Sequence, residues 1–342
     1  ETSSLWTSQT LDFLSPTFVG DEITVTAKVT RKSPATRMLI LEVSVTNQHG
    51  HEVVKGYSTV RMIEQKEQTV SKPMVAVSFD PDVESDGHAN SESVGDQKVI
   101  LVTGGSRGIG AATVRKLVSD SHTVVLNYLN AEQAAQTLVS QIREQGGRAF
   151  AVQGDVADED AVKQLFSFIE SEVGVVESVV HCAAPNPIPQ AFDDLQWDVF
   201  QKHLDTQVKG AFHCVKHALP KMIEAKSGAF VFLGSIFSDG IPPVQQSAYV
   251  LSKSALAALV RSLAVEYGPK GIRLNLVSPG MTHTEMISNI PDKVKMLAKM
   301  NTPLRRLAEP DEVASVIKFL LSPESKHITG ETIRVCGGLI MS

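Results

Sequence analysis

The chain has 342 residues, of which 42% are hydrophobic and 20% charged, which is typical of a globular protein large enough for two domains. A formal net charge of −6 and the lack of Lys/Arg-rich runs argue against nucleic acid or an anionic membrane as a partner. The three cysteines (Cys182, Cys214 and Cys336) are too few for a disulfide framework, and neither a signal peptide nor an apolar run of about 20 residues occurs, so we expect a cytoplasmic protein.

Residues 1–65 are expected to form an N-terminal antiparallel β segment. Between residues 17 and 62 apolar residues alternate with polar ones, first in Ile23–Val29 and then in Leu39–Val45, and Asn47–His51 supplies a turn. So few strands have a thin core, and we expect a missing N-terminal part or a partner to cover one face. The chain begins at Glu1 rather than Met, and we expect it to be a fragment of a longer protein.

The same segment resembles the second half of a MaoC-like hotdog domain, the fold of enoyl-thioester hydratases and dehydratases. The similar stretches are Ser8–Pro16, Val19–Val25 and Leu41–Gly50. In that family the central helix and the acid/base Asp and His come from the earlier half, which this chain lacks. The resemblance therefore assigns hydration chemistry to no residue here.

Residues 66–97 are expected to be a polar linker, because they are rich in Glu, Ser, Asp and Gln. From residue 98 to 342 short apolar runs alternate with helical patterns, which predicts an α/β fold with a doubly wound, Rossmann-type parallel sheet of about seven strands. The expected strands are Val99–Val102, Thr123–Leu126, Ala149–Val152, Ser178–Val180, Ala229–Leu233, Arg273–Val277 and Thr332–Val335.

A glycine-rich loop, Thr103–Gly110, follows the first of these strands and precedes an amphipathic helix from Ala111. Gly104 permits a tight turn, Gly108 lets the backbone approach a pyrophosphate, and Gly110 allows close packing of helix on strand. The positive end of the helix dipole then faces the anion. The loop predicts a dinucleotide site, to which we also assign Ser106 and Ile109.

The ends of the next two strands favour NADP(H). An NAD-specific fold places Asp or Glu after the second strand, whereas this chain has Asn127 and Tyr128. No carboxylate there repels a 2′-phosphate, and Arg107 offers a cation for it. At the end of the third strand Asp155, beside Val156, is expected to accept a hydrogen bond from the adenine amino group or to cap the following helix.

Tyr249 and Lys253 begin an expected helix, and their spacing of four residues puts phenol and ammonium on one face. The ammonium is expected to lower the pKa of the phenol from about 10 and to hold the nicotinamide ribose. Tyr249 would then donate its proton to a carbonyl oxygen as hydride reaches the carbon. Ser235, at the end of the fifth strand, is expected to polarise the same oxygen.

Together these motifs resemble the short-chain dehydrogenase/reductases, and most closely the 3-oxoacyl-thioester (acyl carrier protein) reductases of fatty-acid and polyketide synthesis. The resemblance covers residues 98–342 and includes Asn275–Gly280 and Ile328–Gly338. It implies that the nicotinamide is contacted by Ala183, Pro279, Gly280 and Thr284. It also implies a dimer or tetramer built on helices near residues 197–222 and 248–267.

Two positions depart from the family's pattern. The usual Asn-Asn-Ala-Gly reads His181-Cys182-Ala183-Ala184, and Gln207 replaces an Asn that holds a water for proton relay. Gln keeps the amide but adds a methylene. His213, Cys214 and His217 also suggest a metal site, but no second cysteine pair or convergent carboxylate accompanies them, so no metal is expected.

The sequence therefore predicts NADPH-dependent reduction of a 3-oxoacyl thioester, carried on acyl carrier protein or coenzyme A. A reductase or dehydrogenase of another ketone or secondary alcohol would share every catalytic residue and differ in its pocket. A third hypothesis is a non-catalytic NADP-binding scaffold, which the replacement by Gln207 favours.

Overall fold

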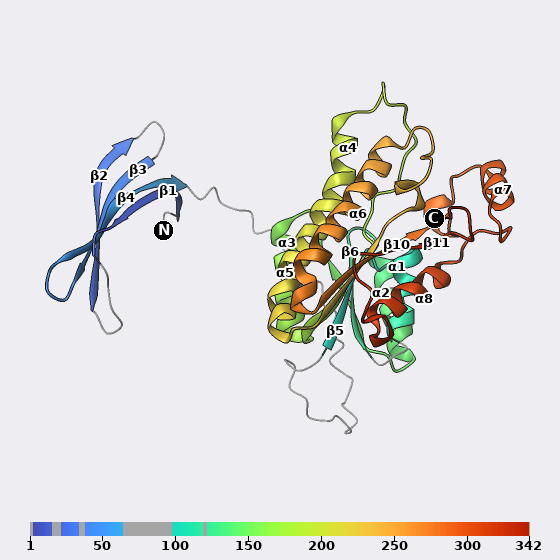
Figure 1. The fold of residues 1–342 in the computed structure, drawn as a ribbon, viewed down its shortest axis with the longest axis horizontal. Coiled ribbons are helices and arrows are strands. Elements are labelled where there is room, and N and C mark those ends of the chain that lie inside the picture. Colours follow the sequence, from blue (N-terminus) through green and yellow to red (C-terminus); the bar gives the residue numbers. More distant parts are fainter. Residues whose placement is uncertain (1–2, 16–21, 34–37, 64–97, 119–121, 342) are drawn as a thin grey trace. The chain divides into compact units, whose positions relative to one another are not determined.

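The structure, a computed structural model, describes residues 3–15, 22–33, 38–63, 98–118 and 122–341. The chain divides into two compact units, Glu1–Pro73 and Met74–Ser342. Each unit has its own sheet (Figure 1). The expected linker, residues 66–97, lies outside the described residues.

The N-terminal unit is a four-stranded antiparallel sheet in the order β1-β4-β3-β2. Its strands are β1 (Ser3–Phe13), β2 (Ile23–Ser33), β3 (Met38–Asn47) and β4 (Glu52–Ile63). The predicted turn after β3 is confirmed, since the amide of Gly50 donates to the Asn47 carbonyl at 2.9 Å. The sequence pattern missed β1, whose apolar residues are sparse among Ser, Thr and Gln.

One strand of this sheet keeps its apolar side chains in solvent. Ile23, Val25 and Val29 of β2 are 53%, 62% and 42% exposed, whereas Val43 of β3 is buried. No described part of the chain covers these side chains, and the expected cover by a missing N-terminal part or a partner stays a prediction.

The second unit is built on a seven-stranded parallel sheet in the order β11-β10-β9-β8-β5-β6-β7, which confirms the doubly wound fold. All seven predicted strands are present: β5 (Lys98–Thr103), β6 (Thr123–Tyr128), β7 (Ala149–Gln153), β8 (Val175–His181), β9 (Gly228–Leu233), β10 (Ile272–Pro279) and β11 (Thr332–Val335). The chain order reverses between β5 and β8, and such a switch point is where open α/β sheets bind ligands.

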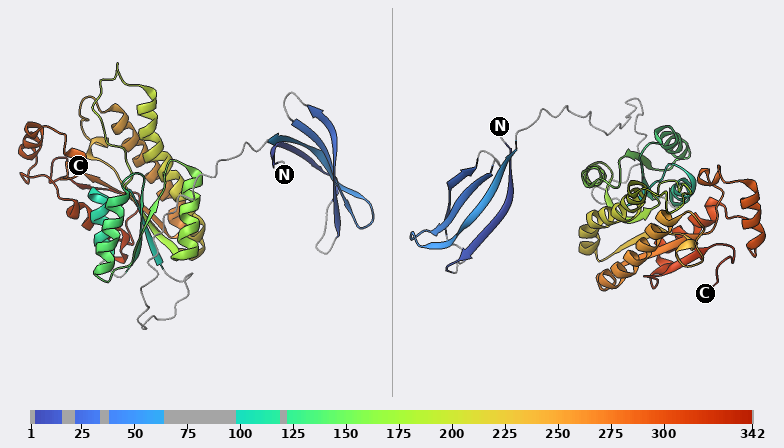
Figure 2. Two further views of the ribbon diagram at one scale, coloured as in Figure 1. Left: turned by 180° about the vertical axis from the view of Figure 1, so that it is seen from behind. Right: turned by 90° about the horizontal axis from the view of Figure 1, so that it is seen from above.

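Two layers of helices cover this sheet, as Figures 1 and 2 show from opposite sides. α3 (Glu159–Glu172), α5 (Gly210–Ala225) and α6 (Ser247–Tyr267) pack on one face. α1 (Gly108–Val118), α2 (Glu132–Glu144) and α8 (Pro310–Leu321) pack on the other. Alternate residues of each central strand enter the two cores, as for Leu101 and Val102 of β5.

The remaining helices lie at the carboxyl ends of the strands or beside them. α4 (Trp197–Leu204) continues through a π-helical turn, Asp205–Lys209, into α5. α7 (Asp292–Asn301) has no buried residue and projects from the side of the unit (Figure 1).

One segment, Ser247–Lys270, is long and apolar enough to cross a membrane by length and composition, with a mean hydropathy of 1.4. Its α6 part buries Leu256, Ala257 and Val260 against the sheet. The expectation that no such stretch exists was too strict, and the packing identifies α6 as a core helix.

Candidate active site

The glycine loop connects β5 to α1 at the switch point of the sheet. Gly104 has a φ of +62°, and a Cβ on it would lie 2.8 Å from the backbone of Ala183 at the end of β8. A Cβ on Gly110 would lie 2.1 Å from the Gly104 carbonyl oxygen, so this glycine lets α1 pack directly on the loop. The loop thus leaves a backbone cradle at the N-terminus of α1, of the kind that accommodates a pyrophosphate.

Side chains of the same loop differ in their burial and in their contacts. Ser106 and Ile109 are half-buried, and Ile109 packs on the core beneath α1. Arg107 reaches across to Glu285, with Nη1 3.1 Å from the carboxylate. The cation expected to meet a 2′-phosphate is therefore in an ion pair, although both side chains are largely exposed.

The expected cofactor residues at the ends of β6 and β7 differ in their burial. Asn127 is 2% exposed and its side-chain amide donates to the carbonyl oxygen of Gly154 at 2.9 Å, so it joins the two strands. Tyr128 and Val156 are also buried. The carboxylate of Asp155 accepts from the Ala157 amide at 2.9 Å.

Asp155 does not cap the following helix. The side chain of Asp158 accepts from the amides of Asp160 and Ala161 and is the N-cap of α3. The alternative role given to Asp155 is wrong, and its carboxylate lies in the turn before the cap.

Ser235, Tyr249 and Lys253 converge near the carboxyl end of β9. Ser235 follows this strand and is 4% exposed, and its hydroxyl lies near enough to the Tyr249 phenol to affect the pKa of that phenol. Lys253 is buried one turn along α6, with Nζ 5.8 Å from the centre of the Tyr249 ring. Its ammonium donates to the Leu233 carbonyl oxygen at 2.5 Å. The structure therefore brings the three predicted side chains together.

The charges in this cluster differ from the sequence expectation. Burial raises the pKa of the Tyr249 phenol, and the Ser235 hydrogen bond only partly opposes this. Burial also lowers the pKa of Lys253 to about 8. The expected lowering of the phenol pKa by Lys253 is therefore wrong for this state of the protein, because desolvation dominates. A phenol that keeps its proton is suited to act as an acid.

Gln207 lies in the π-helical turn and is fully buried behind α6. Its Nε2 is 3.0 Å from Ser252 Oγ and 3.1 Å from Nδ1 of His203. Ser252 in turn donates to the Tyr249 carbonyl oxygen at 2.8 Å. The amide thus connects His203 of α4 to Ser252 of α6, about one helical turn after Tyr249. Its Oε1 has no hydrogen-bond partner among the described residues.

His181 occupies the switch point itself. Its Nδ1 is 2.9 Å from the Thr103 hydroxyl, which joins the carboxyl ends of β8 and β5. The same hydroxyl accepts from the Ala183 amide at 3.4 Å. Burial lowers the pKa of His181 to about 4, with Lys253 acting in the same direction. A neutral imidazole therefore takes the place of the family's usual Asn.

The segment after β10 carries the other expected nicotinamide contacts. The Gly280 amide donates to the Val335 carbonyl oxygen at 2.9 Å, which fixes Pro279 and Gly280 against β11. The methyl group of Thr284 lies 3.3 Å from where a Cβ on Gly108 would be. The structure thus brings Thr284 to the glycine loop.

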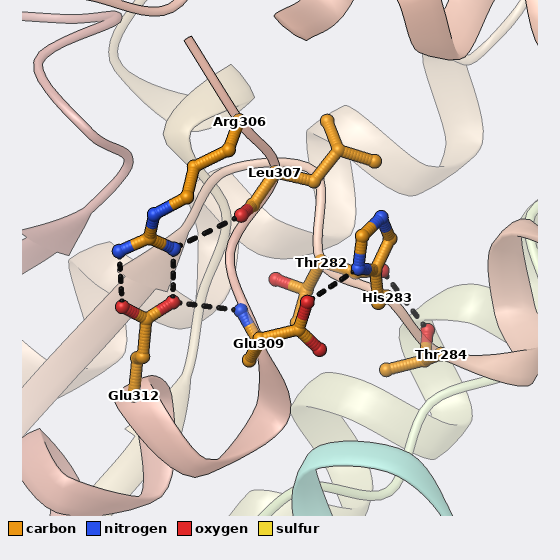
Figure 3. A network of polar contacts seen from close by, with 7 residues as sticks. All are labelled: Thr282, His283, Thr284, Arg306, Leu307, Glu309 and Glu312. Carbon is orange, nitrogen blue, oxygen red and sulfur yellow. Dashed lines mark hydrogen bonds and ion pairs between the residues drawn. The ribbon is translucent and has the colours of Figure 1, made fainter. Parts of the chain in front are cut away.

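A polar network, shown in Figure 3, anchors this segment on α8. His283 Nδ1 and the Glu309 carboxylate are 2.5 Å apart. Glu309 and Glu312 form a capping box at the start of α8, and Arg306 binds Glu312 through two nitrogens at 2.6 and 2.7 Å. Through this network the N-terminus of α8 fixes the position of His283, the residue before Thr284.

His213, Cys214 and His217 do not form a metal site. No group of three or more potential ligands occurs in the described part of the chain. Cys214 is buried, and burial raises the pKa of its thiol to about 12. His217 stacks on Phe166, with ring centres 5.7 Å apart. These side chains therefore belong to the packing of α5.

Sequence reasoning missed three parts of this site. The Glu309-x-x-Glu312 capping box after Arg306 was visible as a local pattern. His203, one helical turn before Gln207, was visible from spacing. The pairing of Arg107 with Glu285 had no local signal, because 178 positions separate the two residues.

Known proteins match the part of the chain that carries this site. Residues 104–340 match the family model described as enoyl-(acyl carrier protein) reductase. The chain is 33% identical over 246 residues to a 3-oxoacyl-[acyl-carrier-protein] reductase of Staphylococcus aureus, which covers 71% of this chain and 98% of that protein. It is 34% identical over 242 residues to cis-4-hydroxycyclohexanecarboxylate dehydrogenase of Sinomonas cyclohexanicum, covering 71% and 96%.

A solved structure agrees with the fold. The crystal structure of 3-oxoacyl-[acyl-carrier protein] reductase from Brucella melitensis superposes with a TM-score of 0.67 at 32% identity. The match covers 73% of this chain and 93% of that chain.

Proposed function

The chain belongs to the short-chain dehydrogenase/reductase family of oxidoreductases, and from that premise we propose that it reduces a 3-oxoacyl thioester to the 3-hydroxyacyl thioester with NADPH. The observation that carries the proposal is the convergence of Ser235, Tyr249 and Lys253 beside a glycine loop at the switch point of the sheet. The names of the Staphylococcus and Brucella relatives support the substrate class.

In this proposal each residue has a distinct task. The hydroxyl of Ser235 and the phenol of Tyr249 hold the ketone oxygen between them. Tyr249 donates its proton to that oxygen as the carbon is reduced, and its raised pKa keeps the proton in place until then. The Lys253 ammonium lies close enough to stabilise the phenolate that remains.

A nicotinamide cofactor fits the residues present. The cradle at Gly104 and Gly110 excludes side chains, and the N-terminus of α1 favours a pyrophosphate there. When bound, the cofactor supplies the hydride. NADPH is favoured because Arg107 is the charged side chain of the loop, and the buried Asn127 leaves no carboxylate at the end of β6. In this proposal Lys253 holds the nicotinamide ribose and Thr284 the nicotinamide amide.

The attached features fit a multienzyme setting. We propose that the acyl group is carried on acyl carrier protein or coenzyme A, and that the N-terminal sheet is part of a MaoC-like hotdog domain, whose relatives act on the 3-hydroxyacyl product. Exposed Phe212 of α5 and Val265 of α6, at 50% and 81%, support assembly into a dimer or tetramer. The three free cysteines support a cytoplasmic location.

A second function has specific support. The Sinomonas relative is named as a dehydrogenase of a hydroxycyclohexanecarboxylate and is as similar as the 3-oxoacyl reductase. Oxidation of a secondary alcohol uses the same residues, with Tyr249 accepting the proton. The two candidates differ in substrate and not in catalytic machinery.

One experiment separates them. NADPH oxidation is followed with a panel of acetoacetyl and longer 3-oxoacyl thioesters and with free cyclic and linear ketones, and the unmodified protein is compared with Tyr249→Phe. We expect turnover of thioesters, reduced roughly 10²- to 10⁴-fold in the variant, because general acid catalysis contributes about that much. Turnover of free ketones alone would favour the second function. Loss of less than half the activity in the variant would remove Tyr249 from the mechanism.

A further inference from the structure

His203, in the last turn of α4, borders the phenol ring of Tyr249. The two rings stand edge to face, with centres 6.1 Å apart and planes at 82°. The imidazole is only 4% exposed, yet it lines a small cavity together with Pro187, Leu195 and Tyr249. A ring with two polar nitrogens therefore borders the space that opens beside the proposed proton donor.

The hydrogen bonds around Gln207 determine which nitrogen of His203 carries the proton. Ser252 has one hydroxyl proton, and it donates that proton to the Tyr249 carbonyl oxygen at 2.8 Å. The Gln207 atom 3.0 Å from Ser252 Oγ must then be the donating amide nitrogen. The same nitrogen is 3.1 Å from Nδ1 of His203. Nδ1 therefore accepts, and the proton of the neutral ring is on Nε2.

The surroundings keep this ring neutral. Burial is the largest factor that lowers the pKa of His203, and the ammonium groups of Lys253 and Lys202 act in the same direction. Because Nδ1 accepts a hydrogen bond from Gln207, the ring can form one further hydrogen bond, as a donor through Nε2–H. The ring is therefore a fixed, uncharged hydrogen-bond donor at the cavity.

We propose that the Nε2–H of His203 binds the second carbonyl oxygen of a 1,3-dicarbonyl substrate while Tyr249 and Ser235 hold the carbonyl that is reduced. The inference rests on the proposed function and identifies the second carbonyl as that of the thioester. Carbonyl oxygens separated by one methylene lie about 3 to 5 Å apart, from bond lengths of roughly 1.2 and 1.5 Å. With this spacing, one carbonyl oxygen can bind the Tyr249 phenol while the other binds the imidazole of His203, which packs against the Tyr249 ring.

Selectivity follows from this donor. A substrate without the second carbonyl leaves the Nε2–H without the bond that the thioester makes, whereas a 1,3-dicarbonyl substrate satisfies it. The amide of Gln190, also at the cavity, donates to the Asp194 carbonyl oxygen at 2.8 Å and is less available. The geometry also gives a reason for Gln207, since the longer side chain bonds Ser252 and His203 with one nitrogen.

Two substitutions of His203 test the assignment. The amide nitrogen of Gln reaches about as far as Nε2 of histidine, whereas the amide of Asn reaches only as far as Nδ1, so His203→Gln keeps the donor at the cavity and His203→Asn keeps only a partner for Gln207. kcat/KM is measured for an acetoacetyl thioester and for a ketone of equal length without the second carbonyl. We expect His203→Asn to lose roughly 2- to 12-fold on the thioester and to change little on the ketone, as for one neutral hydrogen bond. His203→Gln should retain most of the thioester activity.

Val199→Ala, which alters an apolar residue of the same cavity, is the matched control and should affect both substrates alike. Equal losses on both substrates in His203→Asn, or activity kept by Asn and lost by Gln, would overturn the inference. If the variants do not fold, nitrogen-15 NMR of the unmodified protein decides the tautomer, and a proton on Nδ1 would also overturn it. A protein that reduces neither compound contradicts the proposed function instead, and the NMR result still tests His203.

Discussion

Arg107 takes part in two competing interactions if the proposed cofactor is correct. Its pair with Glu285 is 3.1 Å long, with side chains 56% and 71% exposed, and such pairs contribute about 1 kcal/mol or less. A charge-assisted hydrogen bond to a 2′-phosphate contributes about 1.5 to 3 kcal/mol. NADPH should therefore displace Glu285, at a modest cost in affinity.

The two residues should respond in opposite directions. Arg107→Ala should raise the Kd of NADPH roughly 10- to 150-fold, and Glu285→Gln should lower it up to about 5-fold, with little change for NADH in either variant. Fluorescence titration of both cofactors measures this. An equal loss of NADPH and NADH binding in Arg107→Ala would mean that Arg107 only shapes the loop.

His181 gives the protein a specific sensitivity to acid. Its pKa is about 4 in the folded protein and about 6.5 in an unfolded chain, so the unfolded state binds more protons between these values and stability rises with pH through that window. The loss should reach about 2 kcal/mol at pH 5 relative to pH 8. Urea unfolding of the cofactor-free protein and of His181→Asn at both pH values tests this. The variant cannot titrate there, so its difference between the two pH values should be smaller by about that amount; an unchanged difference would contradict the assignment.

At the scale of elements, the π-helical turn between α4 and α5 determines where Gln207 acts. Its amide already contacts Ser252 and His203 at 3.0 and 3.1 Å, so the longer side chain is matched to the helix that carries it. Gln207→Asn should leave the amide short of both partners and slow the chemical step, since misplacement near 1 Å can cost about 10²-fold. Single-turnover NADPH oxidation should show this at unchanged cofactor affinity. A faster step in the variant would mean that the native glutamine is misplaced.

The elements that the sequence predicted are those whose signal is local. Strands buried on both faces appear as continuous apolar runs, and Tyr249 and Lys253 share a face through helical spacing alone. The direction of the Tyr249 pKa was not predictable, because burial depends on neighbours such as Ser235 after β9 and His203 of α4, which only the fold brings to it. The same holds for Asn127, whose residue type suits a ligand but whose amide is used by the carbonyl of Gly154. β1 was not predicted because its few apolar residues, scattered among Ser, Thr and Gln, show little periodicity.

For the whole molecule, the separation into two units predicts that the second, oxidoreductase unit folds alone. Both large cores consist of residues from Val99 onward, so none of their buried side chains comes from the N-terminal sheet. A chain of residues 96–342 should therefore unfold within about 4 °C of the full chain's reductase transition, as expected for a stability difference below about 1 kcal/mol. It should also keep its kcat with NADPH.

The N-terminal unit should behave differently when isolated. Residues 1–73 expose Ile23, Val25 and Val29 on β2, and a small sheet with an apolar strand in solvent has little core to stabilise it. We expect this piece to unfold at lower temperature or to self-associate, as measured by calorimetry and sedimentation, and to show no enoyl-thioester hydratase activity. Two results together would contradict these expectations: aggregation of residues 96–342, and a stable, monomeric N-terminal piece. They would mean that the N-terminal sheet stabilises the oxidoreductase unit and needs no other partner to cover β2.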